Sequence, residues 1–192
     1  IMIIAIGGEP ATGKSTLMKQ WMKDYTWDDV KCTDLLYGMH CQELNTIVLG
    51  KDYFNEEQMF CGTDRLSMAV QPKAIEWFKT SYKPSGVNIV FEGDRLFSAS
   101  FLGEMTSQGH DIRIIYIKAD QSTLDERHVS RNDNQDDKFL KSRKTKLSNI
   151  LSNFELMPYI EEFTNNTIED QSVLVELILK ELNSSDGKMV QG

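Results

Sequence analysis

The chain opens with a short apolar run, followed by glycines and then by an amphipathic segment. Residues 2–6 are all apolar, and Gly7 and Gly8 end the run. Such a continuous apolar run is typical of a strand buried on both faces of a parallel sheet. From Lys14 onward, apolar residues return at positions 18, 21, 22 and 25, which share one face of a helix. The pattern predicts a strand, a glycine-rich loop and a helix in direct succession.

Two later apolar runs repeat this arrangement. Residues 87–91 and 112–117 each precede a polar turn and a segment with helical spacing. Because parallel neighbours need a helical crossover, this alternation predicts an α/β three-layer sandwich with a mostly parallel sheet. Residues 30–32 are a candidate for a further strand, and residues 46–49 and 59–61 are candidates for a small β-hairpin.

The other elements are predicted from caps and apolar spacing. Pro72 suits the first turn of a helix, and Ser122 with Asp125 indicates the start of another that runs to about Arg131. Later positions predict a helix with apolar residues from 147 to 154, a last strand at 159–163 and a final helix from about Thr167.

The length of 192 residues is that of one ordinary domain. We expect a single domain over residues 1–183, with a helical lid at about 120–146 and a flexible tail at 184–192.

Composition narrows the classes of partner and location. The net charge of −8 opposes a sequence-independent grip on nucleic acid, which requires neutralised phosphates. Three cysteines without paired spacing indicate neither a disulfide framework nor a zinc site. The first apolar run is too short for a signal peptide or a membrane span, so we expect a cytoplasmic protein.

A phosphate-binding motif occupies the predicted glycine-rich loop. Residues 8–15 read GEPATGKS, which matches G-x-x-x-x-G-K-[ST] at every specified position. Backbone amides of such a loop cradle phosphates, the lysine reaches the outer phosphates, and the hydroxyl after it binds magnesium. The residues expected to hold a nucleotide are Gly8, Ala11, Thr12, Gly13, Lys14, Ser15 and Thr16.

Beyond this loop, the chain resembles one branch of the P-loop proteins. It lacks the N-K-x-D motif of switch GTPases, and the strand at 87–91 leads into Glu92-Gly93-Asp94 and not into the Asp-Glu of motor ATPases. Together with the small size and the late arginines, this resembles the P-loop kinases of nucleosides, nucleotides, polynucleotide ends and small metabolites. The resemblance implies ATP and Mg²⁺ as ligands and a hydroxyl group as the phosphoryl acceptor.

The resemblance also implies roles for several acids. In such kinases an acid just after the second strand often deprotonates the acceptor, and Asp34 occupies the matching place. Glu92 and Asp94, at the end of a central strand, are the candidates to support magnesium together with Ser15. The alternative for each acid is a helix cap or a solvated turn.

Basic residues late in the chain resemble the lid of these kinases. Arg127 and Arg131 share one helix face and are expected to act on the triphosphate as catalytic groups, beside Lys14. Residues 138–146 add five further cations and no acid. The alternative is a solvated basic face.

The acceptor pocket is expected near residues 62–65. Asp64 and Arg65, together with Asp94 and Arg95, are candidate substrate contacts, and Asp34 is expected to face the acceptor. Asn165 follows the last predicted strand, where related kinases often contact the adenine ring.

The resemblance also suggests which compound accepts the phosphoryl group. The segments GTDRLSMAVQP and VFEGDRLFSASFL resemble small bacteriophage kinases, some of which phosphorylate the hydroxymethyl group of 5-hydroxymethyluracil in DNA. For a phage-encoded protein, the expected location is the host cytoplasm. The acidic net charge counts against DNA, so a nucleoside, nucleotide or small metabolite is the close alternative. A third interpretation is a nucleotide-binding ATPase or switch protein.

Overall fold

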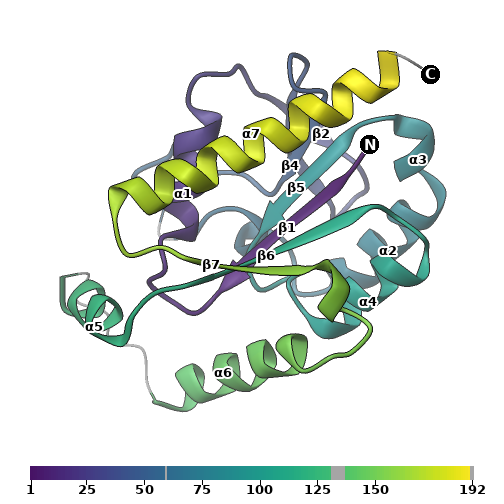
Figure 1. Ribbon diagram of the computed structural model, residues 1–192. Coiled ribbons are helices and arrows are strands. Elements are labelled where there is room, and N and C mark those ends of the chain that lie inside the picture. Colours follow the sequence, from purple (N-terminus) through teal and green to yellow (C-terminus); the bar gives the residue numbers. More distant parts are fainter. Residues whose placement is uncertain (59, 131–136, 191–192) are drawn as a thin grey trace.

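A single seven-stranded sheet organises the chain, with helices on both of its faces (Figure 1). The computed structural model describes residues 1–58, 60–130 and 137–190. The strand order is β2-β3-β4-β5-β1-β6-β7. The strands are β1 Ile3–Gly8, β2 Asp28–Lys31, β3 Tyr37–Cys41, β4 Thr46–Leu49, β5 Asn88–Glu92, β6 Ile112–Lys118 and β7 Ile160–Thr164.

The parallel part of the sheet runs from β4 to β7. β4, β5, β1, β6 and β7 pair in parallel, so their carboxyl ends meet at one edge. Every residue of β1 is buried, as expected for a central strand covered on both faces. The predicted α/β fold with a mostly parallel sheet is confirmed.

The predicted hairpin has a different partner strand. β4 pairs antiparallel with β3, which in turn pairs antiparallel with β2. The segment expected to pair with β4, residues 59–61, has no described residue in a strand, and Met59 lies outside the described residues. An isolated antiparallel bridge joins Lys51 and Gly62, just beyond the two predicted strands. The sequence of β3, YGMHC, carries too little alternation to identify it as the true partner.

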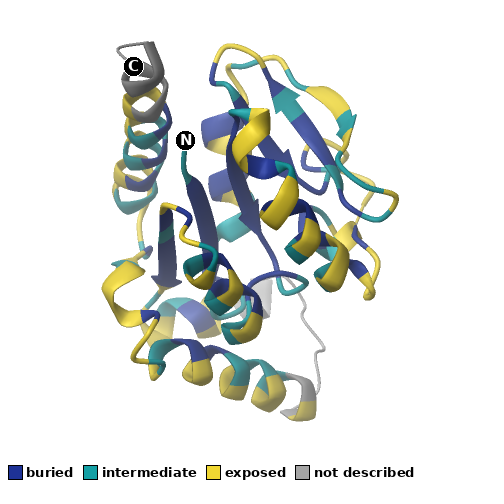
Figure 2. Ribbon diagram, turned by 90° about the vertical axis from the view of Figure 1, so that its right-hand side faces the viewer, coloured by how far each residue is buried: buried dark blue, intermediate teal, exposed yellow. Residues whose placement is uncertain are grey.

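The helices form two layers around the sheet (Figures 1 and 2). α1 (Lys14–Met22) and α7 (Ile168–Val190) cover one face, with a core that includes Leu17 and Ile178. The other face carries α2 (Val70–Thr80), α3 (Tyr82–Ser85), α4 (Ala99–Ser107) and α6 (Asp137–Leu151). The remaining elements are α5 (Gln121–Ser130), η1 (Thr63–Arg65) and η2 (Met157–Tyr159).

Several predicted boundaries shift. α5 begins at Gln121, so Ser122 lies inside it and does not cap it. Phe154 lies beyond α6 and is 84% exposed, so it does not belong to the apolar face of that helix. α7 runs to Val190, past the expected boundary at residue 183. Among the described residues, no helix combines the length and the apolar character needed to cross a bilayer.

Candidate active site

The phosphate loop connects β1 to α1 and lies at the carboxyl edge of the sheet. Gly8 has a φ of 149°, and a Cβ atom there would lie 2.0 Å from the carbonyl oxygen of Ile117 on β6. Gly13, the N-cap of α1, has a φ of 84°. These are positions where a side chain would be strained or blocked, which explains the glycines of the motif in terms of backbone geometry.

The Lys14 side chain folds back and hydrogen-bonds to its own loop. Its Nζ donates to the carbonyl oxygens of Gly8 at 3.2 Å and Glu9 at 2.7 Å, and to Thr12 Oγ1 at 3.3 Å. The side chain therefore lies along the loop, at the N-terminus of α1, where an anion is favoured by the helix dipole and by the first backbone amides.

Acidic groups surround Lys14 at the carboxyl edge. Burial lowers the pKa of Lys14 to about 8, against the raising effects of Glu92, Asp94 and Asp64. Burial also raises the pKa of Glu92 to about 7, and this buried carboxylate accepts a hydrogen bond from Tyr53 OH at 2.8 Å. The site thus places one ammonium among three carboxyl groups, two of them from the end of β5 and its following turn.

Asp64 and Asp94 lie next to each other, because the side chain of one accepts a hydrogen bond from the backbone of the other. The Asp94 N–H donates to Asp64 Oδ1 at 3.1 Å, and Thr63 Oγ1 donates to the Glu92 carbonyl oxygen at 2.7 Å. Burial and the nearby Asp94 carboxylate raise the pKa of Asp64. Arg95 is turned toward η1, where its Nε donates to the Leu66 carbonyl oxygen. The turn after β5 and η1 therefore form one wall of the site.

Asp34 lies at the correct edge but on an outer hairpin. It occupies the turn between β2 and β3, and its side chain is 66% exposed and pairs with Lys73 at 3.8 Å. Strand β2 is separated from β5 by β3 and β4. The strand that lies beside β5 on this side is β4, so the acid closest in sequence to that strand end is not Asp34.

That acid is Asp52, which the sequence reasoning missed. It follows β4, has a φ of 72°, and accepts a hydrogen bond from Arg65 Nε at 2.8 Å. Arg65 is itself fixed, because its carbonyl oxygen accepts from Tyr37 OH at 2.7 Å. A non-glycine residue in this backbone region is uncommon and often marks a functional position.

Arg127 binds the back of the phosphate loop. Its guanidinium donates to the carbonyl oxygens of Ala11 at 3.0 Å and Asn165 at 2.9 Å. Asn165 Nδ2 donates to the Thr12 carbonyl oxygen at 2.8 Å, while its Oδ1 is buried and has no partner among the described residues. The two residues hold the loop in shape. Arg131 lies outside the described residues.

The donor set suits magnesium held mainly by a nucleotide. Among the described residues, no group of three or more His, Cys, Asp or Glu side chains is placed to hold a metal. Mg²⁺ bound with a triphosphate needs only one or two protein oxygens and keeps several waters. Ser15 in the first turn of α1 offers a hydroxyl, which lies 3.5 Å from Cys61 Sγ, and Glu92 and Asp94 offer hard carboxylate oxygens. Thr16 is exposed.

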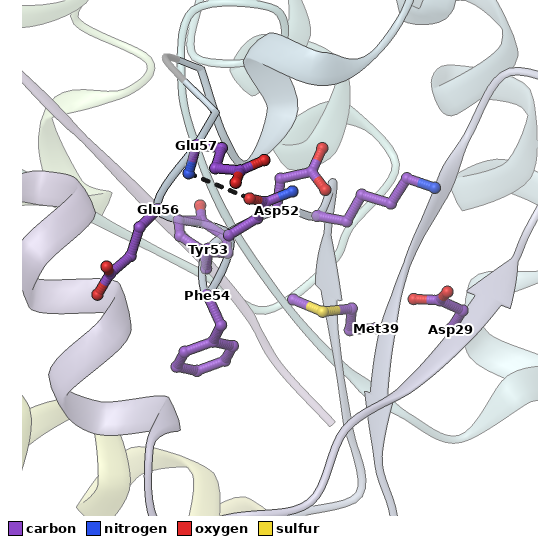
Figure 3. Close-up of a pocket in the computed structure, with 9 residues that line it drawn as sticks. Asp29, Met39, Asp52, Tyr53, Phe54, Glu56 and Glu57 are labelled. Carbon is purple, nitrogen blue, oxygen red and sulfur yellow. Dashed lines mark hydrogen bonds between the residues drawn. The ribbon is translucent and has the colours of Figure 1, made fainter.

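A hollow of about 620 Å³ adjoins this cluster (Figure 3). Its lining includes Asp52, which accepts a hydrogen bond from Arg65, and Tyr53, which donates one to Glu92. Figure 3 shows Phe54 and Met39 beside it, so the lining combines acids with apolar side chains. The volume is within the range of small-molecule sites.

The chain matches one family model and is similar to several solved structures. A family model described as P-loop Nucleotide Kinase3 matches residues 1–175. No match was found among curated protein sequences. The chain is similar to a gluconokinase structure from Sinorhizobium meliloti 1021, with 14% identity, coverage of 98% of this chain and 96% of that one, and a TM-score of 0.45. A shikimate kinase from Bacteroides thetaiotaomicron gives 14% identity, coverage of 95% and 98%, and a TM-score of 0.41.

The family match extends over nearly the whole chain. The matched residues include the phosphate loop, its lysine and the acids at the end of β5. The chain belongs to the P-loop Nucleotide Kinase3 family.

Proposed function

We propose that the protein is an ATP-dependent kinase that transfers the γ-phosphoryl group to a hydroxyl acceptor with the aid of Mg²⁺. The observation that carries the proposal is the position of Lys14, in a phosphate loop and among Glu92, Asp64 and Asp94 at one sheet edge. Phosphoryl transfer depends mostly on positioning and charge stabilisation, and such a cluster supplies both.

The nucleotide would lie along the phosphate loop. Residues Gly8 and Ala11 to Thr16 would surround its phosphates. Asn165 Oδ1 offers the nucleotide a hydrogen-bond acceptor, because it has no partner among the described residues. Ser15 would ligate Mg²⁺, with Glu92 or Asp94 acting through water. A bound magnesium ion would neutralise charge on the β- and γ-phosphates.

Asp52 replaces Asp34 as the proposed general base. It follows the strand next to β5, and Arg65 orients its carboxylate. In the transfer, the acceptor oxygen bonds to the γ-phosphorus while the bond to the bridging oxygen breaks. Asp52 takes the acceptor proton, and ADP leaves.

For the acceptor, we propose the hydroxymethyl group of 5-hydroxymethyluracil in DNA. Support comes from the resemblance to phage kinases and from α6, which exposes Lys138, Lys141 and Lys144 to solvent. Exposed lysines along one helix are suited to phosphate backbones. A nucleoside, nucleotide or small metabolite is the alternative, because the hollow next to Asp52 is lined by several carboxylates.

The test is transfer of label from γ-labelled ATP with magnesium to separate acceptor pools: plain DNA, hydroxymethyluracil-containing DNA, mixed nucleosides and mixed nucleotides. Label confined to the modified DNA would support the DNA acceptor. Label in a free nucleoside or nucleotide would support the alternative. Phosphate release without any labelled acceptor would contradict the kinase proposal and favour an ATPase or switch protein.

Neutralising the exposed face of α6 should separate these acceptors. The triple variant Lys138→Ala, Lys141→Ala, Lys144→Ala is expected to lose DNA phosphorylation at moderate salt while keeping any activity on a free nucleoside. Each lost phosphate contact lowers the salt slope of DNA binding by about 0.7 to 0.9. Lys79→Ala, on the exposed side of α2, is the matched control. An unchanged salt slope in the triple variant would argue against this surface.

Nucleotide affinity should fall at alkaline pH. Burial and the Arg143 charge lower the pKa of Lys14, and Glu92, Asp94 and Asp64 raise it, with a result of about 8. The protonated form binds phosphate, so affinity for ATP is lost as pH rises through about 8. Titrating a non-hydrolysable ATP analogue between about pH 7 and about pH 9.5 measures this. In Lys14→Arg the loss should disappear from that window, because arginine does not titrate there.

A further inference from the structure

Two cations of α6 reach into the site and meet at one residue. Arg143 donates to the Asp94 carboxylate, and Lys146 Nζ donates to the Asp94 carbonyl oxygen at 2.6 Å. The Arg143 side chain is only 18% exposed. Its helix is anchored next to it by Leu147 and Ile150, which are buried in the core beneath the sheet. The position of Arg143 is therefore set by core packing and does not depend on a surface loop.

Arg143 also lies close to the lysine of the phosphate loop. Its charge lowers the pKa of Lys14, and Asp94 and Asp64 act on the same lysine with the opposite sign. Arg127 makes contacts of a different kind, to the carbonyl oxygens of Ala11 and Asn165. Arg143, in contrast, extends from α6 toward the acids near Lys14 and contacts the Asp94 carboxylate.

We propose that Arg143 contacts the transferring phosphoryl group, and that in the substrate-free enzyme Asp94 holds it in reserve. The inference rests on the proposed kinase function. A guanidinium binds a carboxylate and a phosphate through the same planar set of donors, so the two compete for it. A triphosphate on Lys14 carries more negative charge than one carboxylate, and Arg143 then exchanges Asp94 for phosphate oxygens. Asp94 is thus a positioning residue and a competitor of the nucleotide.

The exchange predicts a change in metal-free nucleotide binding, whereas a purely metal-supporting role of Asp94 predicts none. Asp94→Asn keeps the side-chain shape and removes the competing charge. Metal-free binding of a non-hydrolysable ATP analogue, measured in EDTA, is expected to tighten by about two- to fivefold, the scale of one partly exposed ion pair. The gain must depend on Arg143, so the double variant with Arg143→Ala should show no tightening relative to Arg143→Ala alone.

Turnover supplies the second readout. Arg143→Ala is expected to lower kcat by about a hundredfold or more, with a smaller change in KM for ATP, and Arg143→Lys should recover part of the loss. Ser142→Ala, on the exposed side of the same helix, is the control. Thermal melting of each variant reports whether it folds.

Two results would overturn the proposal: weaker or unchanged metal-free binding in Asp94→Asn, or a gain that persists without Arg143. The binding comparison needs no acceptor. It therefore still reads the exchange if label transfer fails for every acceptor, and the failure of the kinase function remains distinguishable from the failure of this inference.

Discussion

Replacing Lys14 with alanine is expected to abolish phosphoryl transfer while the protein stays folded. Lys14 contributes an ammonium group to a cluster of three acids, and we propose that it binds the outer phosphates of the nucleotide. Loss of a cation that stabilises a transferring phosphoryl group costs about a thousandfold or more in kcat. The measurement is the initial rate of label transfer at saturating ATP.

The fold should tolerate this change. The hydrogen bonds of Lys14 Nζ go to carbonyl oxygens and a hydroxyl of its own loop, and none reaches the hydrophobic core. Removing this partly buried ammonium also removes its desolvation cost, although it takes away the positive charge that lowers the pKa of Glu92. Lys23→Ala, exposed after the same helix, serves as the control. Full activity in Lys14→Ala, with an intact melting transition, would refute the assignment of the phosphate loop.

The parts of the site that the sequence predicted are those encoded by contiguous residues. The buried strand, the glycines, Lys14 and the first turn of α1 lie within about twenty residues, and each step has its own local signal. Glu92, the last residue of β5, and Asp94 in the turn after it were singled out because an apolar run of clear strand type leads into them. Their role in supporting magnesium stays a prediction. Local patterns thus suffice to predict the nucleotide half of the proposed site.

The acceptor half depends on which strands are neighbours, and no local signal encodes that. Asp34 was chosen because it follows the second strand in the chain, but β2 is an outer strand of an antiparallel extension. Asp52 follows β4, which pairs in parallel with β5. The strand pairing was predicted wrongly, because the antiparallel partner of β4 was sought after it, at 59–61, while the real partner, β3, precedes it.

The same limit applies to the arginines. The i, i+4 spacing of Arg127 and Arg131 predicted a shared helix face but could not show that Arg127 donates to backbone carbonyl oxygens of Ala11 and Asn165. Arg143 was only one cation of a basic segment. Its contact with Asp94 joins residues far apart in the chain and depends on how α6 packs beneath the sheet.

Asp52→Asn is expected to lower the rate of transfer by about a hundredfold to ten-thousandfold, the usual contribution of a general base. Asp34→Asn, the matched change on the outer hairpin, is expected to leave that rate nearly unchanged. The physical difference lies in their surroundings: Asp34 is 66% exposed beside Lys73, whereas the Asp52 side chain is 19% exposed and oriented by Arg65. Both variants should bind the ATP analogue as the wild type does, because neither residue contacts the phosphate loop.

Single-turnover measurements on preformed complexes with ATP separate the chemical step from product release. A loss in Asp34→Asn with full activity in Asp52→Asn would restore Asp34 as the base and imply that the β2–β3 turn folds over the acceptor. Equal and small effects in both would move the base to Asp64, whose raised pKa favours proton uptake and which hydrogen-bonds to the Asp94 backbone. A large loss confined to Asp52→Asn would assign the base to the strand next to β5, where the acceptor oxygen can approach the phosphoryl group held at Lys14.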